Sequence, residues 1–313
     1  MKQFDFDIDW MGLNGIVNDE SEFIPLLSRD DEEQMENEEL PEELPILPIR
    51  NNVLFPGVVI PITVGRDKSI KLVNDAYNTT KVIGVVAQKD GEIENPEPEH
   101  LHKVGTVARI IKKLKMPDGS ITIIIQGKKR FELAEITETD PYFKGRVKAL
   151  VEIKPEIDQR FTALEASIKD LALRIIQESP NIPSEAQVAI KNIESHSFLI
   201  NFISSNLSRS VDDKQELLEM VDLNLRAEKV LQFLTEEVQM LELKNDIQSK
   251  VRTDIDKQQR EYFLHQQMKQ IQEELGGNPT DQEIQEFKEK AAKKKWPDHV
   301  KEVFNKARLL YFF

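Results

Sequence analysis

The spacing of the hydrophobic positions changes along the chain. From Leu44 to Pro155 the apolar residues form short β-branched runs separated by proline and glycine, which is typical of strands. From Phe161 onward they recur every three or four residues, the spacing of one face of a helix. The stretch 67–77 follows the helical spacing behind Asp67, a residue type that caps helices. The pattern therefore predicts a β-rich domain with one early helix, followed by helices.

The β-rich region divides into about seven predicted strands. Asp118-Gly119 joins two apolar runs and predicts a tight hairpin, while the prolines at 45, 48 and 61 confine their strands to edge or bulge positions. Strands do not alternate with helices, so a parallel sheet is not expected. We expect an α+β protein whose residues 44–155 form a small, mostly antiparallel β-barrel that closes near Pro155. The predicted strands are 44–49, 58–64, 82–88, 104–114, 121–126, 130–136 and 143–153.

The helical region divides into a predicted bundle, residues 156–221, and one very long helix, residues 222–275. No breaker interrupts the long helix, which would span ~80 Å at ~1.5 Å per residue and must project from the domain or bridge two bodies. Its apolar positions do not keep one heptad phase, so packing against different partners at its two ends is favoured over one uninterrupted coiled coil. Gly276-Gly277-Asn278-Pro279 ends it, and residues 280–313 begin a further helical segment.

The negative charge is concentrated at the amino-terminal end. Residues 1–44 contain 15 of the 56 Asp and Glu residues against only Lys2 and Arg29, so nearly all of the net charge of −14 lies there. Such a block repels itself and buries little apolar surface, which predicts a disordered acidic tail over residues 1–43. The tail is either a solubilising leader or a docking arm that uses its apolar residues Phe4, Phe6, Trp10 and Phe23-Ile24.

The composition limits the chemistry and the compartment. Cysteine is absent, which excludes disulfides and thiolate sites and fits a reducing compartment. Neither a signal peptide nor an apolar run of ~20 residues is found, so we expect a cytoplasmic protein without a membrane anchor. His100 and His102 are two residues apart and are the best candidates for metal ligands, but solvated loop histidines explain them more simply. No metal site is predicted.

Motifs for catalysis are missing from the sequence. There is no phosphate-binding loop, no dinucleotide fingerprint and no nucleophile elbow, so no catalytic and no cofactor-binding residue is assigned. The strongest nucleic-acid candidates are the basic runs Lys112-Lys113-Leu114-Lys115 and Lys128-Lys129-Arg130-Phe131. Because Leu114 and Phe131 are expected in the core and the chain has no basic excess, nucleic-acid binding is not the favoured function.

One loop offers an apolar surface for a polypeptide. If Leu54, Phe55, Pro56 and Val58 lie at the rim of the barrel, they form an exposed patch suited to binding unfolded chains. The equally weighted alternative is that Phe55 folds back into the core as a plug. These four residues are the candidate substrate-binding residues.

The ordered set of motifs closely resembles the N-terminal domain of bacterial Lon proteases, from about Leu44 to Asn305. The segments that carry the resemblance are Leu44–Gly57 (LPILPIRNNVLFPG), Ile60–Ile62, Val64–Ile70, Val85–Lys89, Val104–Ala108, Leu114–Gly119, Asp213–Glu219, Gln259–Lys269 and Glu274–Gly276.

This resemblance implies a PUA-like barrel and a helical bundle that bind unfolded or tagged protein substrates for an ATP-dependent protease of misfolded and short-lived regulatory proteins. In the full-length family, a hexameric AAA+ ring binds ATP and Mg, and a Ser-Lys peptidase domain cuts. Neither domain is in this chain, so their residues are not assigned to any position. The resemblance also implies that residues 280–313 begin the linker toward the AAA+ domain. The end of the chain after Asn305 does not resemble the family, which indicates a truncated or frame-shifted product or a fragment. The alternative function is an autonomous PUA-like module for RNA or a small ligand.

Overall fold

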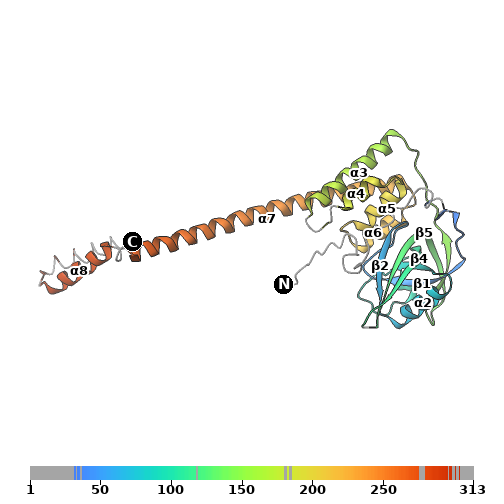
Figure 1. Cartoon of the computed structure of the whole chain (residues 1–313), viewed down its shortest axis with the longest axis horizontal. Helices are drawn as coiled ribbons and strands as arrows, with labels where there is room; N and C mark the ends of the chain where they lie inside the picture. Colours follow the sequence, from blue (N-terminus) through green and yellow to red (C-terminus); the bar gives the residue numbers. More distant parts are fainter. Residues whose placement is uncertain are drawn as a thin grey trace. The chain divides into compact units, whose positions relative to one another are not determined.

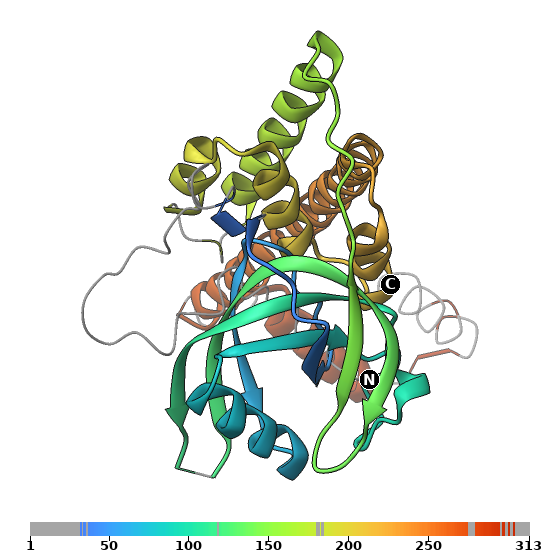
Figure 2. The same cartoon turned by 90° about the vertical axis from the view of Figure 1, so that its right-hand side faces the viewer.

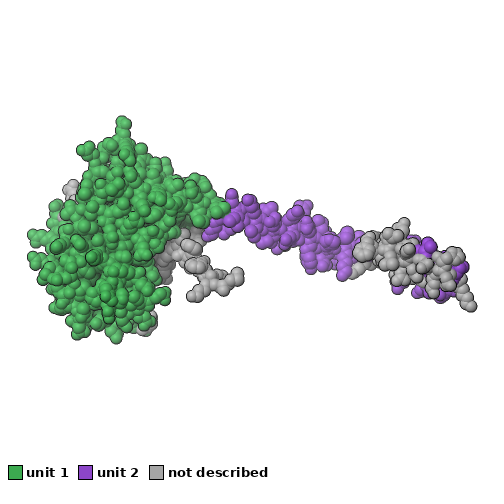
Figure 3. All heavy atoms as spheres, turned by 180° about the vertical axis from the view of Figure 1, so that it is seen from behind, with its two compact units in different colours: residues 1–243 green, residues 244–313 purple. Residues whose placement is uncertain are grey.

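The computed structural model describes residues 32, 34–35, 37–117, 119–179, 182, 185–274, 279–294, 296–297, 300 and 303. Most of the predicted acidic tail, residues 1–31, lies outside this range, as does most of the chain's end beyond residue 297. The chain divides into two compact units, residues 1–243 and residues 244–313, and each is described by itself (Figure 3).

The first unit contains a six-stranded sheet that closes on itself. Its strands are β1 (Glu43–Ile49), β2 (Val59–Val64), β3 (Val82–Ala87), β4 (Val104–Lys115), β5 (Ile121–Glu138) and β6 (Lys144–Ala149). They are ordered β2-β5-β4-β3-β1-β6, and an added pairing of β5 with β6 completes a ring (Figure 2). Among the strands that the structure describes, only β1 and β3 pair in parallel. The predicted mostly antiparallel barrel is confirmed.

One predicted break between strands does not occur. The sequence predicts separate strands over 121–126 and 130–136, whereas β5 runs through both as a single strand of 18 residues. Gly127 lies at the junction, where the register between β4 and β5 shifts. The strand bends there and pairs in turn with β2 and with β6, so the glycine makes a bulge that curves the barrel and not a turn.

The early helix is α2 (Asp67–Asn78), which buries Leu72, Val73 and Ala76 in the core of the unit. Asp67, which the sequence favours as the cap, is instead the first helical residue. Arg66 occupies the N-cap position and makes no capping hydrogen bond through its side chain. The first backbone N–H groups of α2 therefore have no side-chain cap.

The predicted helices after the barrel are present. They are α3 (Gln159–Glu178), α4 (Glu185–Asn192), α5 (His196–Asn206), α6 (Val211–Glu219) and the first part of α7 (Leu223–Glu274). Asp158, Ser195 and Ser210 cap α3, α5 and α6 through their side chains. One continuous apolar core joins these helices to the strands and α2. A smaller second cluster fills the ring around Ile46 and Phe131.

The second unit consists of the rest of α7 and of α8 (Pro279–Lys293), labelled in Figure 1. The very long helix is confirmed, since α7 is continuous over 52 residues. Its second part exposes large apolar side chains that include Ile247, Tyr262, Phe263 and Met268. No described helix combines the length and the apolar character that crossing a bilayer would need.

Candidate functional site

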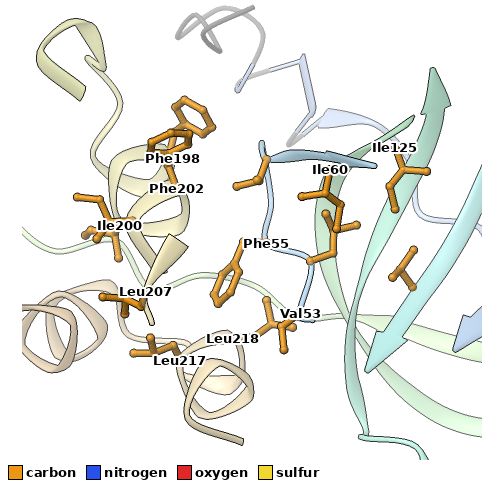
Figure 4. Close-up of a cluster of buried hydrophobic side chains, with 14 of the residues drawn as sticks. Val53, Phe55, Ile60, Ile125, Phe198, Ile200, Phe202, Leu207, Leu217 and Leu218 are labelled. Atoms are coloured by element: carbon orange, nitrogen blue, oxygen red, sulfur yellow. The ribbon is translucent and has the colours of Figure 1, made fainter. Parts of the chain in front are cut away.

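The predicted apolar loop is not a surface patch. Leu54, Phe55 and Val58 have exposed fractions of 2%, 0% and 5%, and only Pro56 is half-buried. The expectation of an exposed patch is therefore wrong, and the alternative of a core plug is confirmed for Phe55. Figure 4 shows the Phe55 ring between Ile60 of the barrel and the helical residues around it. Direct contact with a substrate stays a prediction for these four residues.

Backbone contacts explain why this loop folds inward. Gly57 N–H donates to Gly127 O, and Gly127 N–H donates to Val58 O, each over 2.9 Å. A Cβ at Gly127 would lie 2.3 Å from Phe55 O, so only glycine allows the loop to approach β5 this closely. The hydroxyl of Thr106 donates to Leu54 O over 2.5 Å. The loop is thus fixed to the barrel wall, and its side chains fill the boundary between barrel and helices.

Beside this plug lies a buried ion cluster that joins β5, the segment after β6 and α7. Glu152 Oε2 lies 3.2 Å from Arg130 Nη2 and 3.0 Å from Arg226 Nη1. Arg130 also donates to Leu218 O and Met220 O. Burial and the nearby charge of Arg226 lower the pKa of Arg130 to about 10, although Glu152 opposes this shift. With a pKa of about 10, Arg130 remains charged near neutral pH. Both guanidinium groups are paired with Glu152 and hydrogen-bonded, as buried charges must be.

The basic runs are largely used inside the protein. Arg130 belongs to the ion cluster, and Lys128 Nζ lies 3.4 Å from Glu38 Oε1. Lys129 donates to Glu38 O, and Lys113 donates to Asn74 Oδ1. Lys112 and Lys115 are exposed. A continuous basic surface for nucleic acid is therefore not formed by these runs.

Glu38 lies in the described end of the predicted acidic tail, which contacts the barrel. Met35 is buried with an exposed fraction of 7%. Leu40 packs against the smaller apolar cluster, and Val147 N–H donates to Glu42 O over 3.0 Å. The tail is thus anchored to the barrel from Glu38 onward.

The two candidate metal ligands take different roles. His100 Nδ1 accepts a hydrogen bond from Glu97 N–H and belongs to the cap of a short helix. His102 faces α6, where Nε2 is buried, has no hydrogen-bond partner and lies 3.8 Å from Asp212 Oδ1. Burial lowers the pKa of His102, and the charges of Glu219 and Asp212 oppose this shift. Within the described ranges, no three His, Asp or Glu side chains are placed to share a metal ion.

An open groove of about 1030 Å³ lies between β1, β2, the start of α2 and the loops at 94–96 and 142–143. Its floor contains the buried side chains Ile46, Ile49, Val64 and Leu72. Its walls are half-buried and mostly apolar, and include Pro48, Pro61, Ile62, Pro96, Tyr142 and Phe143. Polar and charged residues line the rest of the groove, and a concave site that combines apolar walls with polar groups is a usual form of a ligand-binding pocket. We call it the β1–β2 groove.

Three cations and two carboxylates line the rim of the β1–β2 groove. The cations are Arg50, Arg66 and Lys68, and the carboxylates are Asp67 and Glu94. Arg50 Nη2 donates to Ile93 O over 3.1 Å, and Arg66 Nη2 donates to Gln88 Oε1 over 2.5 Å. Burial and the charge of Arg50 lower the pKa of Arg66, while Glu94 opposes this shift. The two guanidinium groups are thus held near each other, where an added anion would relieve their repulsion.

Sequence reasoning missed the groove, although one signal pointed to its position. The sequence predicted edge or bulge positions for Pro48 and Pro61, and both line the groove, although Pro48 lies in β1, which pairs with both β3 and β6. Pro61 lies in β2, which among the described strands pairs with β5 alone and is therefore an edge strand. The groove forms from segments far apart in sequence, such as Arg50 and Tyr142, and no local pattern brings these together.

The barrel shares one core with the helical bundle and carries an open groove that has the form of a binding site. The family model described as "ATP-dependent protease La (LON) substrate-binding domain" matches residues 43–236. The chain belongs to this Lon substrate-binding domain family.

Similar proteins agree with this assignment. The chain is 59% identical over 288 residues to a Lon protease of Flavobacterium johnsoniae, and the match covers 92% of this chain and 35% of that relative. It is 49% identical over 286 residues to a Lon protease of Cytophaga hutchinsonii, covering 91% of this chain and 35% of the relative. The chain thus spans about a third of the length of these relatives.

Among solved structures, the N-terminal domain of the Mycobacterium avium complex Lon protease matches with a TM-score of 0.50 at 20% identity. The match covers 62% of this chain and 98% of that domain. At this identity the likeness supports the fold.

Proposed function

We propose that this chain is the substrate-recognition and assembly region of an ATP-dependent Lon protease, and that the β1–β2 groove binds segments of unfolded or tagged polypeptides. The observation that carries the proposal is the open groove itself, with half-buried apolar walls in a chain of the Lon substrate-binding family. Unfolded segments expose apolar side chains that folded proteins bury, so an accessible apolar groove distinguishes the two.

In this proposal the chain recognises misfolded and short-lived regulatory proteins and supplies no catalytic group. Unfolding would depend on ATP and Mg bound by a AAA+ ring, and cleavage on a Ser-Lys peptidase, both in parts of the protease outside this chain. The exposed apolar side chains along the second part of α7, such as Ile255 and Leu264, support assembly into a homo-oligomer, a hexamer in the full-length family. Side chains of this kind are stabilised when a second helix covers them.

The alternative function is an autonomous PUA-like module for RNA or a small ligand, and its RNA form has less support. Its candidate residues were the basic runs, and Arg130 is buried in the ion cluster while Lys128 and Lys129 contact Glu38. Binding to single strands depends on accessible cations and stacking aromatic rings. The exposed cations Lys112 and Lys115 alone provide little of either.

Fluorescence anisotropy separates the two functions. The full chain is titrated into a labelled, permanently unfolded protein, and in parallel into a labelled single-stranded RNA at two salt concentrations. We expect saturable binding of the unfolded protein and only weak, salt-sensitive binding of the RNA. Tight RNA binding without affinity for the unfolded protein would establish the alternative.

A further inference from the structure

The β1–β2 groove has the chemistry of a site for an extended segment that is apolar on one face and acidic on the other. Its half-buried walls supply an apolar surface, and Arg50, Arg66 and Lys68 supply positive charge at the rim. Pro48 and Pro61 lack an N–H, so the strands that flank the groove cannot offer a complete hydrogen-bond ladder to an added strand. Recognition must therefore depend on side chains more than on backbone pairing.

A segment with this character lies at the beginning of the same chain, outside the described residues. The sequence Phe4-Asp5-Phe6-Asp7-Ile8-Asp9-Trp10 alternates strictly between large apolar residues and aspartate. In an extended backbone successive side chains point to opposite sides, so the four apolar side chains would share one face and the three carboxylates the other. This alternation is a specific pattern that the acidic composition of residues 1–44 does not require.

We propose that the segment Phe4–Trp10 of this chain binds in the β1–β2 groove of the same molecule. Its apolar face lies against the groove walls, such as Ile62 and Tyr142, and its aspartates face the rim cations. Two carboxylates, Asp67 and Glu94, also line the rim, and Glu94 lies near Arg66, so the three cations leave an excess of one positive charge at the rim for the aspartates.

The length of the intervening chain permits this contact. Glu38 is fixed to the barrel by Lys128 and Lys129, and Met35 is buried. About 28 residues separate Trp10 from Glu38, and at ~3.3 Å per residue they span up to ~90 Å, more than the diameter of a domain of this size. A segment tethered in this way has an effective concentration on the order of millimolar. Even a weak intrinsic affinity therefore gives substantial occupancy.

If the segment occupies the groove, it competes there with substrate polypeptides, a consequence that rests on the function proposed above. If the groove also binds substrate polypeptides, a substrate must displace the segment Phe4–Trp10 before it can bind. Weakly apolar segments would fail to do so, while strongly apolar ones would succeed. The tail would thus set a threshold for substrate recognition.

The fluorescence of Trp10 tests whether the segment is bound. The chain has two tryptophans, so Trp296→Phe leaves Trp10 as the single probe in the full chain. We expect acrylamide to quench Trp10 several-fold less in this protein than in a free peptide of residues 1–15. Replacing Asp5, Asp7 and Asp9 by Asn should restore quenching to the level of the free peptide.

A matched control replaces three acidic residues elsewhere in the tail, Asp30→Asn, Asp31→Asn and Glu33→Gln, and should leave Trp10 protected. Equal quenching of Trp10 in the full chain and in the free peptide would overturn the proposal. An equal effect of the control variant would also overturn it, because total charge and not the alternating segment would then be responsible.

Crosslinking tests where the segment binds. The chain has no cysteine, so pairs of cysteines can be introduced cleanly. With a short bis-maleimide, Ile8→Cys should link within one molecule to Asn95→Cys at the groove rim, and much less to Val188→Cys, an exposed position on α4. Equal linking to both positions, or links only between molecules, would contradict binding in the same groove.

The same proteins separate this proposal from the function on which its consequence rests. Unfolded polypeptide should bind more tightly to the Asp5, Asp7 and Asp9 variant than to the original chain. If polypeptide binds equally to both and Trp10 is unprotected, only the self-binding segment is refuted. If Trp10 is protected and no polypeptide binds to either protein, only the proposed function is refuted.

Discussion

The barrel has two contrasting regions, the junction with the helical bundle and the β1–β2 groove. At the junction Phe55 is fully buried, and Glu152 is paired with both Arg130 and Arg226. In the groove the cations lie at a rim open to solvent, and Arg66 is held by the side chain of Gln88. Both regions combine apolar side chains with arginines, but only at the junction are the arginines buried away from solvent.

This difference distinguishes arginines that stabilise the fold from arginines that are available to bind a ligand. A buried charge without a partner is costly, so the junction tolerates its arginines only because each one is paired and hydrogen-bonded within the protein. The rim cations remain partly hydrated and retain capacity for an added anion. The same residue type therefore stabilises the fold in one region and is available for recognition in the other.

The largest expected loss of stability comes from removing the carboxylate that pairs with both arginines at the junction. Glu152→Ala leaves Arg130 and Arg226 without their shared carboxylate partner and should lower the free energy of unfolding by about 3–5 kcal/mol. Urea unfolding followed by circular dichroism measures the loss. Glu135→Ala removes a carboxylate from an exposed pair with Arg146 and serves as the control, with an expected loss below about 1 kcal/mol.

Similar losses for the two glutamate variants would contradict the distinction between a sealed and an exposed ion pair. If Glu152→Ala does not fold, Glu152→Gln keeps an oxygen that can accept from Ser197 and gives a measurable intermediate. Its loss should still exceed that of Glu135→Ala.

A smaller effect is expected from adding one methyl group at a glycine in each region. At Gly127 a Cβ would lie 2.3 Å from Phe55 O, so Gly127→Ala must displace the inward loop and should cost about 1–3 kcal/mol. At Gly65, which lines the groove, no atom lies within 4 Å of an added Cβ, and Gly65→Ala should change stability by less than about 0.5 kcal/mol. Thermal unfolding of both variants checks this, and equal costs would show that the groove is as tightly packed as the junction.

The smallest effect concerns the pH dependence of the contact between the barrel and α6. Burial holds the pKa of His102 below its ordinary value of 6.5. As the pH falls through 6.5, the unfolded chain takes up a proton that the folded chain does not, so stability is lost on the acidic side. Asp212, Glu219 and Lys89 are the charged groups that act on this imidazole.

The midpoint of thermal unfolding, measured from pH 7.5 to 5.5, should therefore fall less for His102→Gln than for the original chain. This pH range stays above the pH at which Glu165, whose pKa lies below 4.5, becomes protonated and loses its stabilising charge. Parallel curves for the two proteins would show that His102 does not titrate differently in the two states.

The helices and most strands could be predicted from the sequence because the spacing and type of neighbouring residues determine them. The helical spacing of 67–77 and the unbroken pattern after Asp222 predicted α2 and α7, and short β-branched runs predicted most of the strands. The one wrong break, near Gly127, arose because a glycine that bends a strand looks like a glycine that ends one. The wrong cap at Asp67 differs from the observed one by a single residue.

Tertiary contacts were not predictable in the same way. The sequence left the exposed patch and the core plug equally weighted at Phe55, and the close approach of Gly127 decided between them. The pairing of Glu152 with both Arg130 and Arg226 brings together residues up to 96 positions apart, and no periodicity indicates it. The groove likewise exists only when β1, β2 and the loop at 142–143 come together.

The most direct test of the account fills the β1–β2 groove without disturbing the junction. Gly65→Trp places a large side chain in the groove from a position with open space around it, and Val188→Trp adds the same side chain to an exposed site on α4. In anisotropy titrations with a labelled unfolded protein, Gly65→Trp should raise the Kd at least ~10-fold, or ~1.4 kcal/mol, while Val188→Trp leaves it unchanged. Unchanged binding by a folded Gly65→Trp variant would show that the polypeptide binds elsewhere.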